Sequence, residues 1–308
     1  MKKVVKIGTR KSPLALKQTD LFVEALKEKY PDIKVEIVTI ITSGDKLQNI
    51  SLANVGGKGL FTKEIEEGLL SGELDFAVHS MKDMPTVLPE GLEINCMLKR
   101  EDARDAFLST KAKTIYDLPK GAVFGTASAR RKALVKNLRP DLEVKLLRGN
   151  IETRIQKMQN GEVDATMLAV AGLVRADKMH VAQSVFEIDE ILPAVGQGAI
   201  GIEVASSNKE ALDMAASINC SETYFRVSVE RAFLNKLDGS CKTPIAGYMS
   251  EKNNKGEYNF KALIARPDGS ELVKREIIID GADLDKVMQK AEQLALEVKN
   301  KLPDGFLV

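Results

Sequence analysis

Two short sequence patterns each occur twice in this chain, in the same order. Gly8-Thr9 recurs as Gly125-Thr126, each time between a predicted strand and a predicted helix. Gly72-Glu73-Leu74-Asp75 recurs as Gly161-Glu162-Val163-Asp164, each time between a predicted helix and a predicted strand. Patterns that keep both their order and their structural context indicate a duplicated β-α-β lobe. We therefore expect an α/β fold with two like lobes and a cleft between them that faces the strand ends.

Hydrophobic periodicity and turn residues give the rest of the organisation. Ser12 and Pro13 are typical of a helix start, and the apolar spacing after them continues to about Lys29. The glycine-punctuated residues 193–204 end in a strand that we expect to cross back to the first lobe. Beyond about Ser221, a helix, three strands with tight turns and a last helix are typical of a small α+β domain. The predicted domains are 1–98 plus about 196–220, 99–195, and 221–308.

A length of 308 residues suits two or three domains. The net charge of +1 argues against a chain that coats nucleic acid or an anionic membrane. No stretch approaches the roughly 18 apolar residues that a membrane span needs, and the first residues lack the apolar region of a signal peptide. We expect a cytoplasmic protein that binds neither nucleic acid nor membrane.

Residues 72–85 concentrate polar chemistry at one strand end. The apolar run Leu74–Val78 is followed at once by His79, Ser80, Lys82 and Asp83, and Pro85 prevents the strand from continuing. Asp83 is either a solvated loop aspartate or a catalytic carboxylate, and its neighbours favour the second interpretation. A carboxylate there could stabilise a transient cation and relay protons from an attached N–H group.

Arginine is unevenly distributed along the chain. Eight of the thirteen arginines fall between residues 100 and 175, whereas the lysines are scattered. Arginine is preferred where a planar carboxylate or phosphate is held at two points. Several arginines of the whole chain also lie near strand ends or helix starts, where backbone N–H groups attract anions. These are Arg10, Arg130, Arg131 and Arg148.

Two alternatives to a small-ligand site compete for these basic positions. Any single arginine could form a surface ion pair. Nucleic acid could be the anion, but aromatic residues are only 5% of the chain and none lies between the basic positions, so base stacking has little support. A small ligand with several negative charges fits this group of arginines best.

The glycines at 56–59 are a separate motif, which could cradle a phosphate or form a mobile lid carrying Lys58.

The three cysteines, Cys96, Cys220 and Cys241, include no C-x-x-C pair, so neither a disulfide framework nor a structural zinc site is indicated. Cys241 follows Gly239 and Ser240 and precedes a lysine, which favours a reactive or modified thiol over a buried small residue. The two histidines lie far from it in sequence, so thiol-protease chemistry is weakly supported.

Taken together, these motifs closely resemble the porphobilinogen deaminase family, whose members are also called hydroxymethylbilane synthases. The matching strings occur in the family's order along most of the chain. They are residues 9–16, 55–61, 77–85, 125–131, 147–150, 192–198 and the loop around Cys241. Asn54 stands where some members carry a further cleft lysine.

The resemblance implies an α/β fold with two periplasmic-binding-protein-like lobes plus a small C-terminal α+β domain, in a monomer. It also implies a dipyrromethane cofactor joined to Cys241 by a thioether, onto which four porphobilinogen molecules are added head to tail with loss of ammonia. Water then releases hydroxymethylbilane. The alternative is a non-catalytic two-lobe protein that binds a polycarboxylate.

Residue by residue, the resemblance assigns Asp83 to the pyrrole N–H groups and to the azafulvenium-like cation left by deamination. It places Lys58 on a mobile loop over the cleft and Gln197 at the interdomain crossing. Acetate and propionate groups of cofactor, substrate and growing chain would be held by Arg10, Ser12, Ser80, Lys82, Thr126, Ser128, Arg130, Arg131, Arg148, Arg154 and Arg175.

Overall fold

The computed structural model describes residues 4–42, 62–237, 243–281, 283–303 and 305–306. Lys58, Asn54, the glycines at 56–59 and Cys241 lie outside these residues. The chain divides into two compact units, residues 1–101 with 199–224 and residues 102–198 with 225–308. The boundaries of the three predicted domains remain a prediction. No helix in the described ranges is long and apolar enough to cross a membrane.

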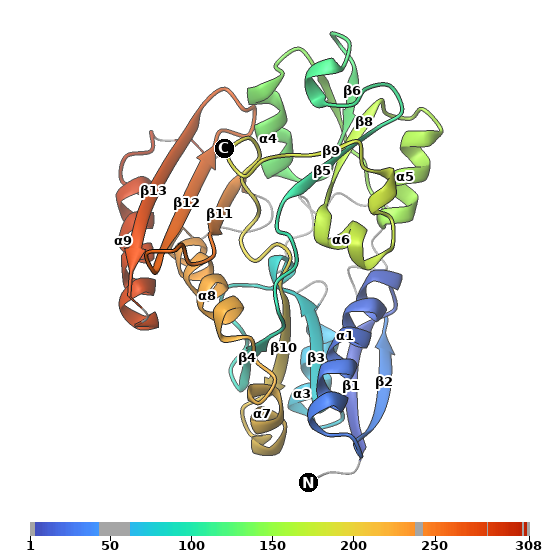
Figure 1. Cartoon of the computed structure of the whole chain (residues 1–308), viewed down its shortest axis with the longest axis vertical. Helices are drawn as coiled ribbons and strands as arrows, with labels where there is room; N and C mark the ends of the chain where they lie inside the picture. Colours follow the sequence, from blue (N-terminus) through green and yellow to red (C-terminus); the bar gives the residue numbers. More distant parts are fainter. Residues whose placement is uncertain (1–3, 43–61, 238–242, 282, 304, 307–308) are drawn as a thin grey trace. The chain divides into compact units, whose positions relative to one another are not determined.

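The first unit is built on a five-stranded sheet with the order β2-β1-β3-β10-β4 (Figure 1). β1, β2 and β3 are parallel, whereas β10 runs antiparallel to both β3 and β4. The strand expected to cross back thus lies inside the first sheet. The strands are β1 (Val4–Arg10), β2 (Lys34–Ile40), β3 (Phe76–Ser80), β4 (Leu92–Met97) and β10 (Ile200–Ala205), and the helical segments are α1 (Pro13–Lys29), α3 (Lys63–Leu70), the 3-10 turn η1 (Met81–Asp83) and α7 (Lys209–Ala216).

The second unit contains a sheet of the same design, with the order β7-β6-β8-β5-β9. β6, β7 and β8 are parallel, and β5 runs antiparallel to β8 and β9. We call the two sheets with their helices the first and the second lobe. The second lobe contains β5 (Asp105–Ser109), β6 (Val123–Gly125), β7 (Glu143–Lys145), β8 (Ala165–Ala169), β9 (Ser184–Val185), α4 (Ala129–Leu138), α5 (Ile151–Gln159), α6 (Val170–Arg175), η2 (Ile115–Asp117) and η3 (Met179–Val181).

The strand registers show that the two lobes match residue by residue. Gly8 lies opposite Ala77 in the first lobe, and Gly125 lies opposite Thr166 in the second. A Cβ atom on Gly8 would come within 2.5 Å of the side chain of Leu74, and one on Gly125 within 2.8 Å of the side chain of Leu147. Glycine is therefore needed in β1 and in β6 because a leucine side chain from another connection fills the space that a Cβ atom would take.

The repeated aspartates have matching roles as well. Asp75 accepts a hydrogen bond from the backbone N–H of Lys6 in β1 (3.0 Å), and Asp164 accepts one from the N–H of Val123 in β6 (2.7 Å). Each carboxylate thus accepts a backbone N–H in the first part of β1 or β6, where the strand ladder alone does not satisfy it. The duplication expected from the sequence is confirmed by topology, register and these contacts.

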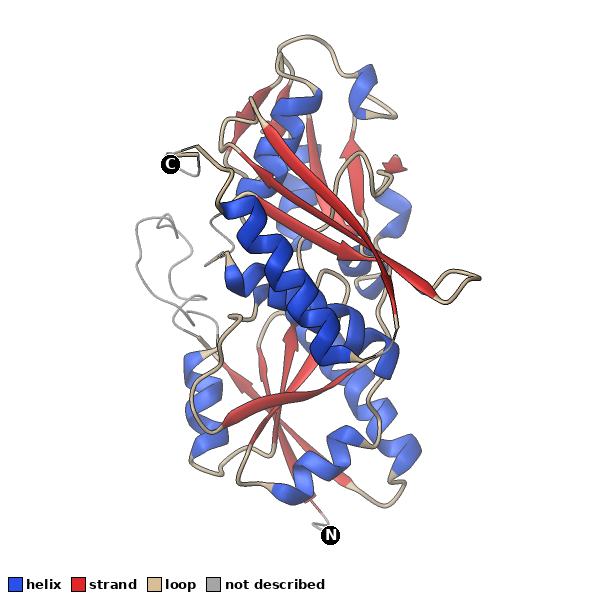
Figure 2. Cartoon of the chain, turned by 90° about the vertical axis from the view of Figure 1, so that its left-hand side faces the viewer, coloured by secondary structure: helices blue, strands red, loops and turns tan. Residues whose placement is uncertain are grey.

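The remainder of the second unit is a three-stranded antiparallel sheet with two long helices. Val287 and Ala291 of the last helix pack on Phe260 of the central strand, so this helix covers one face of the sheet (Figure 2). Leu263 and Ala265 face the other way and share a core with Leu134 of the second lobe. The expected small α+β domain is confirmed. Its elements are α8 (Ser221–Lys236), β11 (Ile245–Met249), β12 (Glu257–Ala265), β13 (Leu272–Asp280) and α9 (Leu284–Lys299).

Candidate active site

The carboxyl ends of β1 and β3 form one edge of the first lobe's sheet, because these strands are parallel neighbours. Arg10 ends β1 and Ser80 ends β3. The Gln18 amide on α1 donates to Ser80 Oγ (2.8 Å) and accepts from it (3.1 Å). Ser12 caps α1 by accepting from the backbone N–H of Ala15 (3.3 Å). The edge thus brings several predicted site residues together on a strand, a strand end and a capped helix.

Asp83 and Lys82 project from the turn η1, which follows β3 directly. Both side chains are exposed, whereas Met81 and Met84 on either side are buried. The backbone N–H of Met81 donates to the carbonyl of Ala199 (3.1 Å). A Cβ atom on Gly201 would lie 2.1 Å from the sulfur of Met81. The absence of a side chain at Gly201 therefore makes room for the buried side chain of Met81. The buried side chains of Met81 and Met84 therefore fix the turn, while the carboxylate of Asp83 stays accessible.

A buried ionisable pair lies behind this edge. His79 Nε2 and Glu203 Oε2 are 2.9 Å apart, and both side chains are almost completely buried. Glu66 on α3 is also buried, and this burial raises the pKa of its carboxyl group, with the nearby Glu203 adding to the effect. The side chain of His79 thus lies in the interior next to Glu203, and His79 directly precedes Ser80 in β3.

In the second lobe, the segment after β6 forms the matching edge. Thr126 Oγ1 accepts from the backbone N–H of Ser128 (3.2 Å), and Ser128 Oγ accepts from the backbone N–H of Arg131 (3.3 Å), which caps α4. This cap places Arg130 and Arg131 in the first turn of α4. Backbone N–H groups at such a helix start favour anions.

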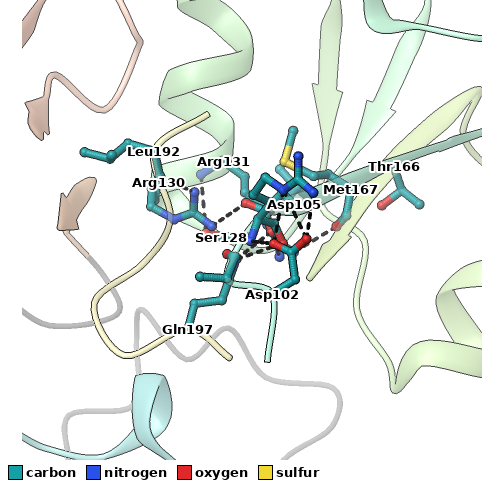
Figure 3. A network of polar contacts seen from close by, with 12 residues as sticks. Asp102, Asp105, Ser128, Arg130, Arg131, Thr166, Met167, Leu192 and Gln197 are labelled. Atoms are coloured by element: carbon teal, nitrogen blue, oxygen red, sulfur yellow. Dashed lines mark hydrogen bonds and ion pairs between the residues drawn. The ribbon is translucent and has the colours of Figure 1, made fainter. Parts of the chain in front are cut away.

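Both arginine side chains turn inward and share one carboxylate (Figure 3). Arg130 Nη2 lies 2.7 Å from Asp105 Oδ2, and Arg131 Nη2 lies 2.6 Å from Asp105 Oδ1. Nη1 of Arg130 donates to the carbonyl of Leu192 (2.7 Å), and Nη1 of Arg131 donates to that of Met167 (2.8 Å). The two side chains are only about 5–6% exposed. They form a buried cluster, which we call the Asp105 cluster.

The Asp105 cluster also includes Gln197. Its Nε2 donates to the carbonyl of Ala103 (2.6 Å) and to Asp105 Oδ1 (3.0 Å). Gln197 belongs to the segment that precedes β10 and lies in the second unit. Gln197, the residue predicted at the interdomain crossing, thus donates to the same carboxylate that binds Arg130 and Arg131.

The other predicted arginines of the second lobe are half-buried. Arg154 Nε donates to the carbonyl of Gly149 (2.7 Å), and Arg175 Nη2 donates to that of Gly198 (2.6 Å), beside Gln197. Arg148 follows β7, on the same edge as Thr126. The second edge thus gathers the predicted residues of the second lobe on the carboxyl ends of β6, β7 and β8.

Sequence reasoning missed Gln18, Asp105 and Glu203. Asp105 has a detectable signal, because an acidic residue directly before the apolar run Ala106-Phe107-Leu108 is unusual in a buried strand. Glu203 lies in the same way within the apolar residues 200–205. Among the described residues, no group of three or more His, Cys, Asp or Glu side chains could hold a metal ion.

Comparison with known proteins identifies the family. The profile "Porphobilinogen deaminase, dipyromethane cofactor binding domain" matches residues 5–213, and "Porphobilinogen deaminase, C-terminal domain" matches residues 224–304. The chain belongs to the porphobilinogen deaminase family. The porphobilinogen deaminase of Bacillus subtilis is 45% identical over 295 residues, covering 96% of this chain and 93% of that protein. The chloroplastic enzyme of Pisum sativum is 48% identical over 308 residues, covering 98% of this chain and 83% of that protein.

Among solved structures, the VFT2 domain of Bordetella pertussis BvgS matches with a TM-score of 0.43 at 15% identity, covering 75% of this chain and 91% of that one. An ancestral arginine-binding protein matches with a TM-score of 0.39 at 20% identity, covering 71% and 91%. At these TM-scores the likeness supports no inference about this chain.

The described residues of this porphobilinogen deaminase family member fit the carboxylates of a dipyrromethane cofactor. The Asp105 cluster holds two guanidinium groups against a single carboxylate, so it carries surplus positive charge. The Nε atoms of Arg130 and Arg131 are buried and have no hydrogen-bond partner within the described ranges. Such a cluster is ready for a further anion. Cys241, the expected attachment point, lies outside the described residues.

Proposed function

We propose that this chain condenses four porphobilinogen molecules head to tail on a dipyrromethane primer and releases hydroxymethylbilane by hydrolysis. As a member of the porphobilinogen deaminase family, the chain is a transferase. The observation that carries the proposal is the match of both family domains, in order, along almost the entire chain. The alternative, a non-catalytic polycarboxylate-binding protein, is not favoured because the curated relatives are deaminases.

Asp83 is the proposed catalytic carboxylate. In each condensation the C–N bond of the substrate's aminomethyl group breaks, ammonia leaves, and the carbon forms a new C–C bond to a pyrrole that loses a proton. The substrate carbon is cationic between these events, and a fixed, accessible carboxylate stabilises such a charge. η1 supplies that carboxylate, because the buried Met81 and Met84 hold Asp83 outside the core.

The basic and hydroxyl side chains on the two edges are proposed to hold carboxylates. Each pyrrole unit brings two carboxylate groups, so the growing chain adds negative charge at every step. In the first lobe this role falls to Arg10, Ser12, Ser80 and Lys82. In the second it falls to Thr126, Ser128, Arg130, Arg131, Arg148, Arg154 and Arg175. When bound, the cofactor supplies the pyrrole carbon to which the first substrate is joined.

Three further assignments complete the proposal. Cys241 carries the cofactor, Lys58 belongs to a loop that covers the substrate, and Gln197 fixes the segment between the second lobe and β10. The protein acts as a monomer in the cytoplasm, with domains at 1–98 plus about 196–220, 99–195 and 221–308. These assignments are supported by the family resemblance of the surrounding residues.

Intact mass tests the covalent cofactor. The purified protein should exceed its sequence mass by one dipyrromethane, and Cys241→Ser should remove the excess. Cys220→Ser is the matched control, because Cys220 is partly buried and accepts a hydrogen bond from Thr223 (3.3 Å); it should keep the added mass. Full activity in a protein without added mass would refute the proposal.

Turnover of Asp83→Asn tests the catalytic role. The variant should keep its fold and its cofactor mass, yet lose turnover by a factor on the order of 10² to 10⁴, which is typical when a catalytic acid or base is removed. Glu90→Gln, an exposed change on the connection after η1, should leave turnover unchanged. Substantial activity in Asp83→Asn would contradict the assignment.

A further inference from the structure

Asp105 occupies a position where one side chain controls two cations. It is the first residue of β5 and lies opposite Ala169, the last residue of β8, so it sits on the second edge among the strand ends. Its side chain is completely buried. One oxygen accepts from Arg130, and the other accepts from both Arg131 and Gln197. The carboxylate therefore fixes the direction of both guanidinium groups.

Each guanidinium is held at two of its nitrogens. Nη2 is bound to Asp105 and Nη1 to a backbone carbonyl, Leu192 for Arg130 and Met167 for Arg131. A guanidinium has five N–H donors, so donors remain on each side chain after these bonds. A planar group pinned at two points cannot rotate, and its remaining donors point in set directions.

The charges of the cluster do not cancel. Two cations and one anion leave a surplus of one positive charge in a place with little water. Burial alone would raise the pKa of Asp105, but the adjacent Arg131 and Arg130 hold it well below its usual range, so the carboxylate stays ionised. Burial lowers the pKa of Arg130, and the contact with Asp105 opposes this. Asp105 thus allows Arg130 and Arg131 to lie close together, and its single negative charge neutralises only one of their two positive charges.

We infer that Asp105 is a positioning residue for the condensation: it sets the direction and the combined charge of Arg130 and Arg131, through which this edge holds ligand carboxylates. The inference rests on the proposed function. Asp105 touches the arginines and Gln197 and acts through them. Its counterpart in the first lobe, Ile200 opposite Ser80, has no charge, so the arrangement belongs to the second lobe.

Two variants of the full-length protein separate positioning from simple charge balance. Asp105→Glu keeps the charge but lengthens the side chain, which displaces both guanidinium groups; displacements of about 1 Å can cost on the order of 100-fold in function. Asp105→Asn keeps the shape but removes the charge. Asp102→Asn is the matched control, because Asp102 pairs with Arg104 in the same charged stretch (2.8 Å).

Three readouts are compared: the fraction of protein that carries the dipyrromethane mass, KM and kcat for porphobilinogen, and the thermal midpoint. We expect Asp105→Glu to keep a near-native midpoint while KM rises on the order of 10- to 100-fold with a smaller change in kcat. Asp105→Asn should lose cofactor mass, and Asp102→Asn should match the parent in mass and KM.

Parent-like cofactor mass and KM in both Asp105 variants would overturn the inference. So would a parent-like KM in Asp105→Glu together with a defect confined to Asp105→Asn, since charge balance alone would then suffice. A parent protein without the added mass would instead refute the proposed function.

Discussion

The two lobes share one architecture but place their buried charges differently. In the first lobe, His79 and Glu203 lie within the sheet; the matched positions in the second lobe are Leu168 and Leu108. In the second lobe, Asp105 lies at the sheet edge, where the first lobe has Ile200. Each lobe therefore has a buried ionisable group at a place where the other is apolar.

This comparison distinguishes residues that both lobes share, which maintain the architecture, from residues that differ between the lobes, which determine the chemistry of each edge. The residues common to both lobes have structural roles: Gly8 and Gly125 leave room for packed side chains, and Asp75 and Asp164 each accept a backbone N–H. The residues that differ decide what each edge presents. The first edge presents an exposed carboxylate with Lys82, and the second presents arginines held by Asp105.

The largest expected effect comes from breaking the pair unique to the first lobe. His79→Leu should lower the free energy of unfolding by about 3–5 kcal/mol, because a buried carboxylate at Glu203 loses its partner. His79→Leu combined with Glu203→Leu copies the apolar pair of the second lobe and should recover most of this loss. Urea unfolding measures both. A double variant as unstable as the single one would show that the two interiors are not interchangeable.

A smaller effect tests the shared glycines. Gly125→Ala should cost about 1–3 kcal/mol, because the new methyl group meets Leu147 Cβ at 2.9 Å as well as the end of its side chain. Gly8→Ala should cost less, because its closest contact is the flexible end of Leu74. Gly172→Ala, within α6 and 3.2 Å from Ile151, is the control and should be nearly neutral. Thermal unfolding ranks the three. A larger loss for Gly8→Ala would contradict the comparison.

The smallest effect concerns the shared aspartates. Asp164→Asn and Asp75→Asn should each cost about 1 kcal/mol at neutral pH, because each carboxylate accepts a backbone N–H. Lys111 and then the Val123 N–H lower the pKa of Asp164 below its unfolded value.

The sign of the pH dependence follows from this lowered pKa. Asp164 contributes stability above an unfolded pKa near ~4, and this contribution disappears as pH falls through the folded pKa. The difference between parent and Asp164→Asn should thus be level from about pH 5 to 8 and shrink below about pH 4. Urea unfolding across this range checks the trend; a difference that grows in acid would contradict it.

Much of the fold was predictable because local patterns report it. The repeated Gly-Thr and Gly-Glu-x-Asp strings record backbone contacts that both lobes need, so they revealed the duplication. β5 is hard to recognise from sequence because it begins with Asp105 after a charged stretch, and aspartate is rare in strands. The aspartate is tolerated at the start of β5 because Arg130 and Arg131 of α4, about 25 residues away, donate to it, and local sequence does not reveal this contact.

The candidate site was predictable to the level of its sheet edges. Strand-end positions could be read from the sequence for Ser80, Asp83 and Thr126. The direction of the arginine side chains could not, because it depends on partners that only folding brings near. Arg130 reaches Leu192, 62 residues away, and His79 reaches Glu203, 124 residues away.

The place of β10 in the first sheet has a consequence for how the chain is made. β10 lies between β3 and β4, yet it is translated after every strand of the second lobe. The second sheet, contiguous from Asp105 to Val185, can therefore assemble on the ribosome while the first is still incomplete. We expect a nascent chain stalled with residues up to Gly198 outside the ribosome to protect the second lobe from protease and to leave β4 cleavable. Of the two lobes, the one whose synthesis begins first is thus completed second.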